Sequence, residues 1–176
     1  KIYHNSIHNE SLTTGSVCLG TFGSDNLIRK NNLASTGLGY TIFVWSLAAN
    51  TVEYNNLWTS NINLAKLQND YVTDLLTFND LAGSANLAYY PFFTDDQLRT
   101  VAPKLDDYGP SFGITTDFNN APRDATSPDI GAHEFTSDPA MTPLSGTINV
   151  GVGQSYGTLQ EFMTALSFRG VSGLLT

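Results

Sequence analysis

The chain has 176 residues, 41% of them hydrophobic and 14% charged, and a formal net charge of −8. This composition is typical of one or two small folded domains and excludes a disordered tail. Eight basic against sixteen acidic residues leave no basic surface, so no nucleic acid partner is expected. The longest apolar run, 42–45, is far shorter than the ~20 residues of a membrane-spanning helix, so no membrane insertion is expected.

Three short segments in the first third of the chain share one pattern, in which an asparagine stands three residues after an aliphatic residue. The asparagines are Asn5, Asn31 and Asn55, so the pattern recurs at nearly equal intervals. A second apolar series, 16–19 and 41–44, recurs at the same interval. A fixed period of this length is typical of repeat proteins, whose units bury their apolar faces only by stacking on one another.

The residue types within the repeats predict strands. Runs of four to seven β-branched, aliphatic and aromatic residues are broken by Gly, Asn and Ser, and no helical pattern of ten residues occurs before Asn61. A coil of ~25 residues with short strands and tight turns is what a parallel β-helix requires, because each strand pairs with its equivalent one turn away. We therefore predict an all-β fold with a parallel β-helix.

In such a coil Asn5, Asn31 and Asn55 stack in one column. An asparagine amide at a bend bonds the next asparagine along the column, and asparagine tolerates left-handed backbone, so we predict a structural ladder here. Lys30 belongs to the preceding column, and its charge predicts that this column faces solvent. The single cysteine, Cys18, lies in an apolar run and is expected to be buried.

The pattern changes after Asn61. From Asn61 to Leu81 the apolar residues are too irregularly spaced for one long amphipathic helix, so we expect a loop with a short helical turn. Residues 86–93 are consistent with a further rung, which ends where Pro91 removes a hydrogen-bond donor.

The acidic segment, residues 95–138, has nine acidic and three basic residues and so holds −6 of the net charge of −8. It contains the stretch TDFNNAPR, 116–123, and the motif DIGAHEF, 129–135.

These residues resemble the closing signature of a family of secreted, right-handed parallel β-helix proteins, which are pectate-lyase-like. Tandem modules of this kind look like those in very large surface adhesins of gliding bacteria and in cargo of the type 9 secretion system. The resemblance covers residues 1–136 and departs from the family pattern at Asn120, where family members usually carry Gly.

The resemblance implies that residues 1–136 are the C-terminal coils and cap of a right-handed module. A cap is needed because an open β-helix end exposes unpaired backbone groups. We predict that charge-assisted hydrogen bonds tie the cap down through Asp117, Arg123, Asp129 and Glu134. The alternative is a calcium ion bound by the carboxylates of Asp117 and Asp129, although no EF-hand spacing is present.

Residues 137–146 have the composition of a linker, with two prolines and small turn-forming residues. Beyond it, 147–176 resemble the start of a second β-helix module, in which a strand precedes a capping helix and the first rung. A helix is also predicted by its own pattern, since Leu159, Phe162, Met163 and Leu166 share one helical face and Gly170 is placed to end it. We therefore expect the chain to be a segment of a tandem array.

Two functions are consistent with these features. The first, implied by the resemblance, is a non-catalytic structural or adhesive module of a large secreted, cell-surface bacterial protein. Its partners would be neighbouring modules of the same polypeptide and a polysaccharide or other cell-surface ligand. The second is a fragment of a polysaccharide lyase or glycoside hydrolase of the same fold.

The enzyme alternative needs two nearby carboxylates for glycoside hydrolysis, or a base beside a bound uronate for lyase chemistry. Glu53 has Arg29 and Tyr3, and no acid, at the equivalent positions of the neighbouring rungs. Arg29 and Glu53 are expected to form an ordinary surface ion pair. No catalytic residue is therefore predicted.

Carbohydrate binding without turnover would use exposed aromatic side chains that stack on sugar rings. The candidates are Trp58, Tyr54 and Tyr3, and Trp58 is the best placed because it follows an asparagine turn. Trp45, within the largely apolar stretch 42–47, is expected to pack inside the coil.

Overall fold

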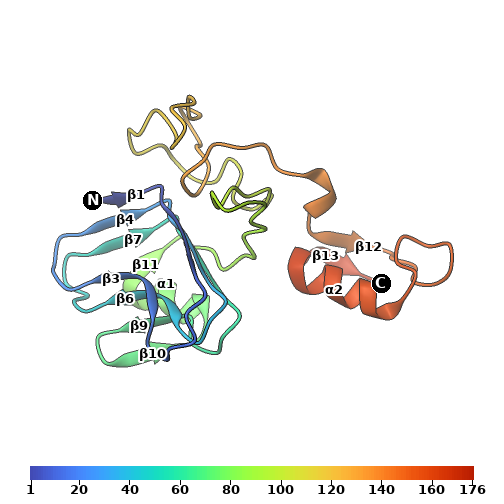
Figure 1. Ribbon diagram of the computed structural model, residues 1–176, viewed down its shortest axis with the longest axis horizontal. Helices are drawn as coiled ribbons and strands as arrows, with labels where there is room; N and C mark the ends of the chain where they lie inside the picture. The colour runs from blue at the N-terminus through green and yellow to red at the C-terminus, as the bar shows by residue number, and fades with distance from the viewer. The chain divides into compact units, whose positions relative to one another are not determined.

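The computed structural model describes residues 1–176, except for the side chains of residues 167 and 168. The chain forms two compact units, Lys1–Ser137 (unit 1) and Asp138–Thr176 (unit 2). It is mainly β, with parallel sheets (Figure 1). None of the helices that the structure describes is long and apolar enough to cross a membrane.

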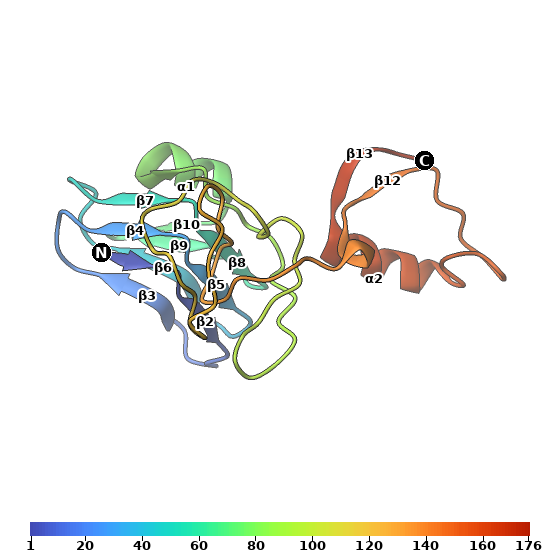
Figure 2. The same cartoon turned by 90° about the horizontal axis from the view of Figure 1, so that it is seen from above.

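The strands of unit 1 form three sheets, in each of which equivalent strands of successive sequence repeats lie side by side (Figures 1 and 2). The first sheet contains β1 (Ile2–Tyr3), β4 (Leu27–Arg29), β7 (Thr51–Glu53) and β11 (Gly83–Ser84). The second sheet contains β2 (Ser6–Asn9), β5 (Asn32–Ser35) and β8 (Asn56–Thr59). The third sheet contains β3 (Val17–Thr21), β6 (Tyr40–Val44), β9 (Ala65–Leu67) and β10 (Asp70–Val72), of which β10 alone is antiparallel to its neighbour.

The register of the first two sheets is the one expected from the sequence. Ile2 lies beside Ile28 and Ile28 beside Val52, so these strands are offset by the same spacing as the asparagines. The same spacing relates β2, β5 and β8. The alignment of the second apolar series is wrong, because it places Leu19 beside Val44, whereas Leu19 lies beside Ile42. The loop before β3 is longer than the loop before β6, and this difference in length moves the third sheet out of the common period.

The third sequence repeat carries an insertion. After β9 the chain adds β10 and helix α1 (Leu75–Ala82) before it returns to β11, where Gly83 lies beside Val52. Asp74 caps α1 by accepting a hydrogen bond from the Thr77 N–H at 2.8 Å. The stretch 61–81 therefore contains an antiparallel strand pair as well as the expected short helix. Strands as short as β9 and β10 give no periodic signal in the sequence.

The core of unit 1 is built across the repeats. Leu33 of β5 lies beside Leu57 of β8, and Val44 of β6 beside Leu67 of β9, and all four side chains are buried. Phe78 joins this core from α1. Since each inward side chain packs on its equivalent in the next repeat, the repeats are stable only together.

Beyond residue 94 unit 1 has little regular structure, but it is packed around a second small core of Ala102, Leu105 and Ile130. This part of the acidic segment lies against the corner where the first sheet turns into the second. The N–H of Gly131 donates to the carbonyl of Lys30 at 2.8 Å, and the N–H of Ala132 donates to Ser6 Oγ at 3.0 Å.

Unit 2 contains a 3-10 helix (Pro139–Met141), β12 (Leu144–Gly146), α2 (Leu159–Arg169) and β13 (Val171–Leu175), and β12 and β13 are parallel. The helix predicted from the apolar pattern is confirmed. Thr158 and Glu161 form a capping box at its start, and Gly170, with φ 66°, ends it. The 3-10 helix and β12 lie within 137–146, so this stretch has more regular structure than a linker.

Candidate functional site

The predicted asparagines lie in one column at the corner between the first and second sheets. Asn5 Nδ2 donates to Asn31 Oδ1 at 2.8 Å, and Asn31 Nδ2 donates to Asn55 Oδ1 at 2.9 Å. The same oxygens accept the backbone N–H groups of Asn5 and Asn31, both at 3.0 Å. The column continues to Asn86, whose Oδ1 accepts from Asn55 Nδ2 at 3.0 Å. Sequence alignment did not include Asn86 in the ladder, because the insertion in the third repeat places it outside the period of the other asparagines.

The residue before each of the first three ladder asparagines has left-handed backbone, with φ of 55° at His4, 60° at Lys30 and 56° at Tyr54. We call these three side chains the corner column. The prediction that this column faces solvent is wrong, because Lys30 is 0% exposed. Its ammonium donates to three backbone carbonyls of the acidic segment, those of Tyr108, Gly109 and Pro128. These partners are far away in the sequence, so no local pattern indicates the contact.

The DIGAHEF motif packs on the same corner. Gly131 has φ 108°, and a Cβ at this position would lie 2.7 Å from Ser6 Oγ, so both the backbone and the space require glycine. Gly109 has the same role beside Tyr54, where an added Cβ would lie 2.3 Å from the aromatic ring. The two glycines therefore let the backbone of the acidic segment approach the corner column closely.

The charged residues predicted to hold this segment lie in one hydrogen-bonded network. Arg123 donates to Glu134 Oε2 at 3.0 Å and to the carbonyl of Gly131 at 2.8 Å. The backbone N–H of Asp129 donates to Glu134 Oε2 at 3.2 Å, and Asp117 Oδ2 accepts the N–H of Glu134 at 3.2 Å. The structure thus brings the four residues together, but of the three acids only Glu134 makes a direct ion pair with Arg123.

Burial is the largest single influence on the pKa values of Asp117 and Asp129 in this network and of Lys30 and His4 beside it. It raises the pKa of Asp129 to about 7 and lowers the pKa of Lys30 to about 8, although the two opposite charges attract each other. Burial also raises the pKa of Asp117, but the backbone N–H donors around this carboxylate outweigh it and hold the pKa below its usual value. Burial, with the positive charges of Arg123 and Lys30, lowers the pKa of His4 to about 3, so its imidazole is neutral at physiological pH.

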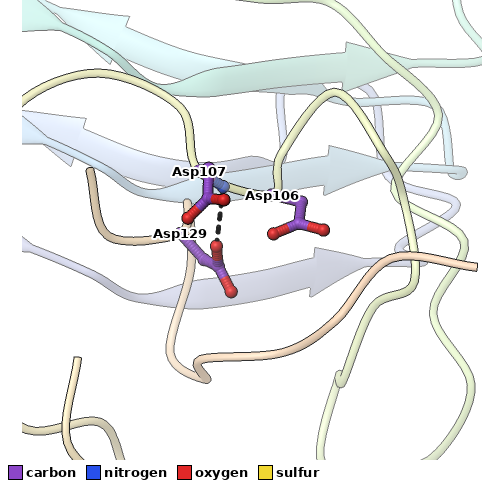
Figure 3. Close-up of side chains that lie close together, drawn as sticks. All are labelled: Asp106, Asp107 and Asp129. Atoms are coloured by element: carbon purple, nitrogen blue, oxygen red, sulfur yellow. Dashed lines mark hydrogen bonds between the residues drawn. The ribbon is translucent and has the colours of Figure 1, made fainter. Parts of the chain in front are cut away.

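Asp129 also lies beside Asp106 and Asp107, and carboxylate oxygens of the three residues lie within 4.8 Å of one another (Figure 3). Oxygen ligands of this kind suit calcium. This group contains Asp129 but not Asp117, the second residue of the predicted calcium pair. Asp129 Oδ1 already accepts the N–H of Asp107 at 2.8 Å, and the positive charge of Lys30 acts on the same carboxylate and opposes a cation.

The aromatic candidates for sugar stacking are partly covered. The rings of Tyr3 and Tyr54 lie 6.0 and 5.7 Å from that of Phe112 in the acidic segment. Trp58 packs edge-on against Tyr90 with the ring centroids 4.8 Å apart. The prediction that Trp45 packs inside is wrong, since it is 50% exposed. Side chains alternate along a strand, so the inward position of Val44 places the next residue on the outer face.

The residues considered for catalysis make structural contacts. Glu53 pairs with Arg29 at 2.6 Å, as expected, but this is not an ordinary surface pair. The two side chains are only 20% and 21% exposed, and the Arg29 guanidinium lies 4.3 Å from the ring centroid of Phe112. A cavity of about 600 Å³ lies between residues 4–6, at the corner of the first and second sheets, and the acidic segment, and it is lined by Asp96, Asp117 and His133 among others. Within it, Asp117 accepts three backbone N–H groups, and His133 Nε2 lies 3.1 Å from the carbonyl of Gln97. These contacts favour positioning of the segment over acid–base chemistry.

Comparison with family models, curated proteins and solved structures gives no significant match.

Proposed function

We propose that unit 1 is the C-terminal part of a right-handed parallel β-helix, and that the chain is a non-catalytic structural and adhesive module of a large secreted bacterial surface protein. The observation that carries the proposal is the in-register stacking of strands across three sequence repeats beside a continuous column of hydrogen-bonded asparagines. A stack in which each repeat contacts its neighbours forms a stiff rod that can be lengthened by adding repeats. The resemblance of the DIGAHEF motif supports secretion and a place on the cell surface.

The acidic segment supports this proposal because it packs on the stacked repeats and stabilises them. Its carbonyls accept hydrogen bonds from the buried Lys30 of the corner column, and Gly109 and Gly131 let its backbone approach that column closely. Its side chains Asp117, Arg123, Asp129 and Glu134 are held in one hydrogen-bonded network. Residues committed to such contacts are poorly suited to acid–base catalysis, because their protons and lone pairs are already engaged.

We also infer that unit 2 begins a second module. Its short parallel sheet and capped helix leave apolar side chains on the surface, including Leu159, Met163 and Leu174. A following coil that stacked on these side chains would bury them, as the repeats of unit 1 bury one another.

The proposal is tested on the native polypeptide. An antibody against residues 1–137 should detect a band far larger than 19.1 kDa, and external protease should remove this band from intact cells. An antigen that is protected inside intact cells would contradict the surface location.

Catalysis is tested separately. The purified chain should release no new reducing ends from polygalacturonate or from neutral polysaccharides. Release by the wild-type chain would contradict the non-catalytic assignment and favour the hydrolase or lyase alternative.

A further inference from the structure

A row of aromatic side chains lies on the outer face of the third sheet. Ile42 and Val44 of β6 face the core, so Phe43 and Trp45 face outward. The ring of Phe43 lies 5.4 Å from that of Phe22 and 6.0 Å from that of Trp45, and both contacts are edge-to-face. Phe22 follows β3 directly, so the row crosses neighbouring strands of the sheet.

The row extends across β9 to β10. Phe43 lies beside Lys66 in the register of the sheet, and Lys66 lies beside Tyr71. The Lys66 ammonium is 5.9 Å from the ring centroid of Phe43 and 5.1 Å from that of Tyr71, distances at which a cation is attracted to an aromatic face. We call Phe22, Phe43, Trp45 and Tyr71 the aromatic strip.

Three of the four rings of the aromatic strip are exposed to solvent, and Phe43 is partly buried. Phe22 is 73% exposed, Tyr71 51% and Trp45 50%. Gly20 lies beside Phe43 in the register, and the ring of Phe22 lies 3.8 Å from the place that a Cβ of Gly20 would take. This is an ordinary contact distance, so the ring of Phe22 packs over the backbone of β3 at Gly20.

We propose that the aromatic strip binds a single chain of a neutral polysaccharide by stacking on its sugar rings. The inference rests on the proposed adhesive function and assigns it a surface. Pyranose rings present apolar C–H faces that suit exposed aromatic rings. Neighbouring strands are about 4.8 Å apart, close to the length of one sugar unit. A glycan that crosses the strands therefore meets Phe22 at the end of β3 and Phe43 on β6, then Lys66 on β9, and then the ring of Tyr71 on β10.

The size of the aromatic strip favours a glycan chain over a protein partner. An aromatic side chain offers about 150–250 Å² when it is fully buried in a contact. Four partly exposed rings therefore offer roughly 300–500 Å², whereas a stable protein interface buries about 800 Å² on each partner. A narrow row of rings suits a narrow ligand.

Charge selects the neutral class of glycan. The chain carries −8 overall, and Lys66 is the one cation among the residues that define the row. Its ammonium already lies against two rings, where it orients them and can donate hydrogen bonds to sugar hydroxyl groups. A polyanionic glycan would be repelled by the net charge of the protein.

The test is native affinity electrophoresis of the full chain through gels that contain hydroxyethyl cellulose, dextran, laminarin or mannan, with polygalacturonate as the acidic comparison. We expect at least one neutral polymer to retard the wild-type chain more than polygalacturonate does. The double variant Phe22→Ala/Trp45→Ala should weaken this affinity at least about tenfold, because it removes two stacking rings. Trp45→Phe, which keeps a ring, should retain most of it.

Two controls make the result specific. Phe118 is 72% exposed in the acidic segment, outside the aromatic strip, so Phe118→Ala should bind as the wild type does. Urea midpoints should show that the double variant remains folded. Failure of all four neutral polymers to bind, stronger binding of polygalacturonate, or an equal loss in Phe118→Ala would overturn the proposal. Such a failure together with surface exposure in the protease experiment would leave the adhesive module itself in place.

Discussion

The buried lysine at the corner shows how much one side chain contributes to holding unit 1 together. Lys30 donates to three carbonyls of the acidic segment while Asp129 and Glu134 stabilise its charge. A charge is tolerated in the interior only when it is hydrogen-bonded and compensated. The contact therefore couples the second sequence repeat to residues 108–128.

Replacement of Lys30 by methionine should destabilise unit 1 by about 3 kcal/mol, since it leaves three carbonyls and nearby carboxylates without their buried cation. The free energy of unfolding is measured by urea denaturation. Lys104→Met, at an exposed lysine of the same acidic segment, is the matched control and should change stability by less than about 0.5 kcal/mol. Equal effects of the two substitutions would show that the buried contact contributes nothing.

The neutral histidine of the corner column predicts a dependence of stability on pH. The folded pKa of His4 is about 3, below its unfolded value of 6.5, so the unfolded chain binds more protons between these values. The contribution of His4 to stability is therefore present above pH 6.5 and is lost as the pH falls toward 3. The slope approaches ~1.4 kcal/mol per pH unit.

His4→Gln should remove this loss, so the difference in unfolding free energy between the variant and the wild type should change across pH 6.5 to 3. Asp129 acts in the opposite direction, because its raised folded pKa of about 7 makes its own contribution fall as the pH rises from about 4 to 7. The wild-type curve alone therefore mixes two trends, and the comparison with His4→Gln separates them. A difference that stays constant with pH would contradict the assignment.

Two residues illustrate why parts of the site could not be predicted from sequence. The sequence predicts a solvent-exposed Lys30, because no residue near it in the sequence indicates the carbonyls that surround its ammonium. Trp45 reads as a core residue because it ends an apolar run, yet the alternation of the strand places it outside. The burial of Lys30 depends on residues that are distant in sequence, and the exposure of Trp45 depends on which face of the strand it occupies.

At the scale of elements, the asparagine ladder could be predicted because it repeats at a fixed spacing on one corner. The third sheet could not be aligned correctly, since the loops that lead into it differ in length. The charged residues around the DIGAHEF motif were identified by sequence proximity, but the corner that they pack on was not. Local repetition is visible in a sequence, whereas the docking of an irregular segment is not.

The ladder predicts a graded effect of asparagine removal. The Asn55 side chain is fully buried and bonds both neighbours in the column as well as the carbonyls of Ile28 and Glu53. Asn55→Ala should therefore cost about 2–4 kcal/mol of unfolding free energy. Asn5→Ala, at the exposed end of the column, should cost less than about 1 kcal/mol. Urea midpoints measure both, and equal costs would show that the column does not act as a ladder.

At the scale of the whole molecule, the chain divides between residues 137 and 138. The stretch 136–143 spans this division and contains exposed positions, and its backbone–backbone hydrogen bonds are the local ones of the 3-10 helix. Such segments are preferred sites of proteolysis. The division therefore predicts where the intact chain is cut first.

Limited digestion of the full chain with subtilisin should cleave first within 136–143 and leave a persistent fragment that ends near residue 137. Mass spectrometry of the early products identifies the site. First cleavage within 95–130 instead would mean that the acidic segment is not held on the corner as the hydrogen bonds indicate.

The left-handed corner has a consequence for how such a chain can be elaborated. In each of the four successive turns of the chain, the residue that precedes the ladder asparagine has left-handed backbone, and the last of these residues is Ala85 with φ 51°. The insertion of β10 and α1 in the third repeat therefore leaves the geometry of the corner intact. Variation in length is thus confined to loops away from the corner. The junction between β10 and α1 is accordingly a natural graft point, where a foreign loop or an epitope could be displayed without changing the stacking beneath it.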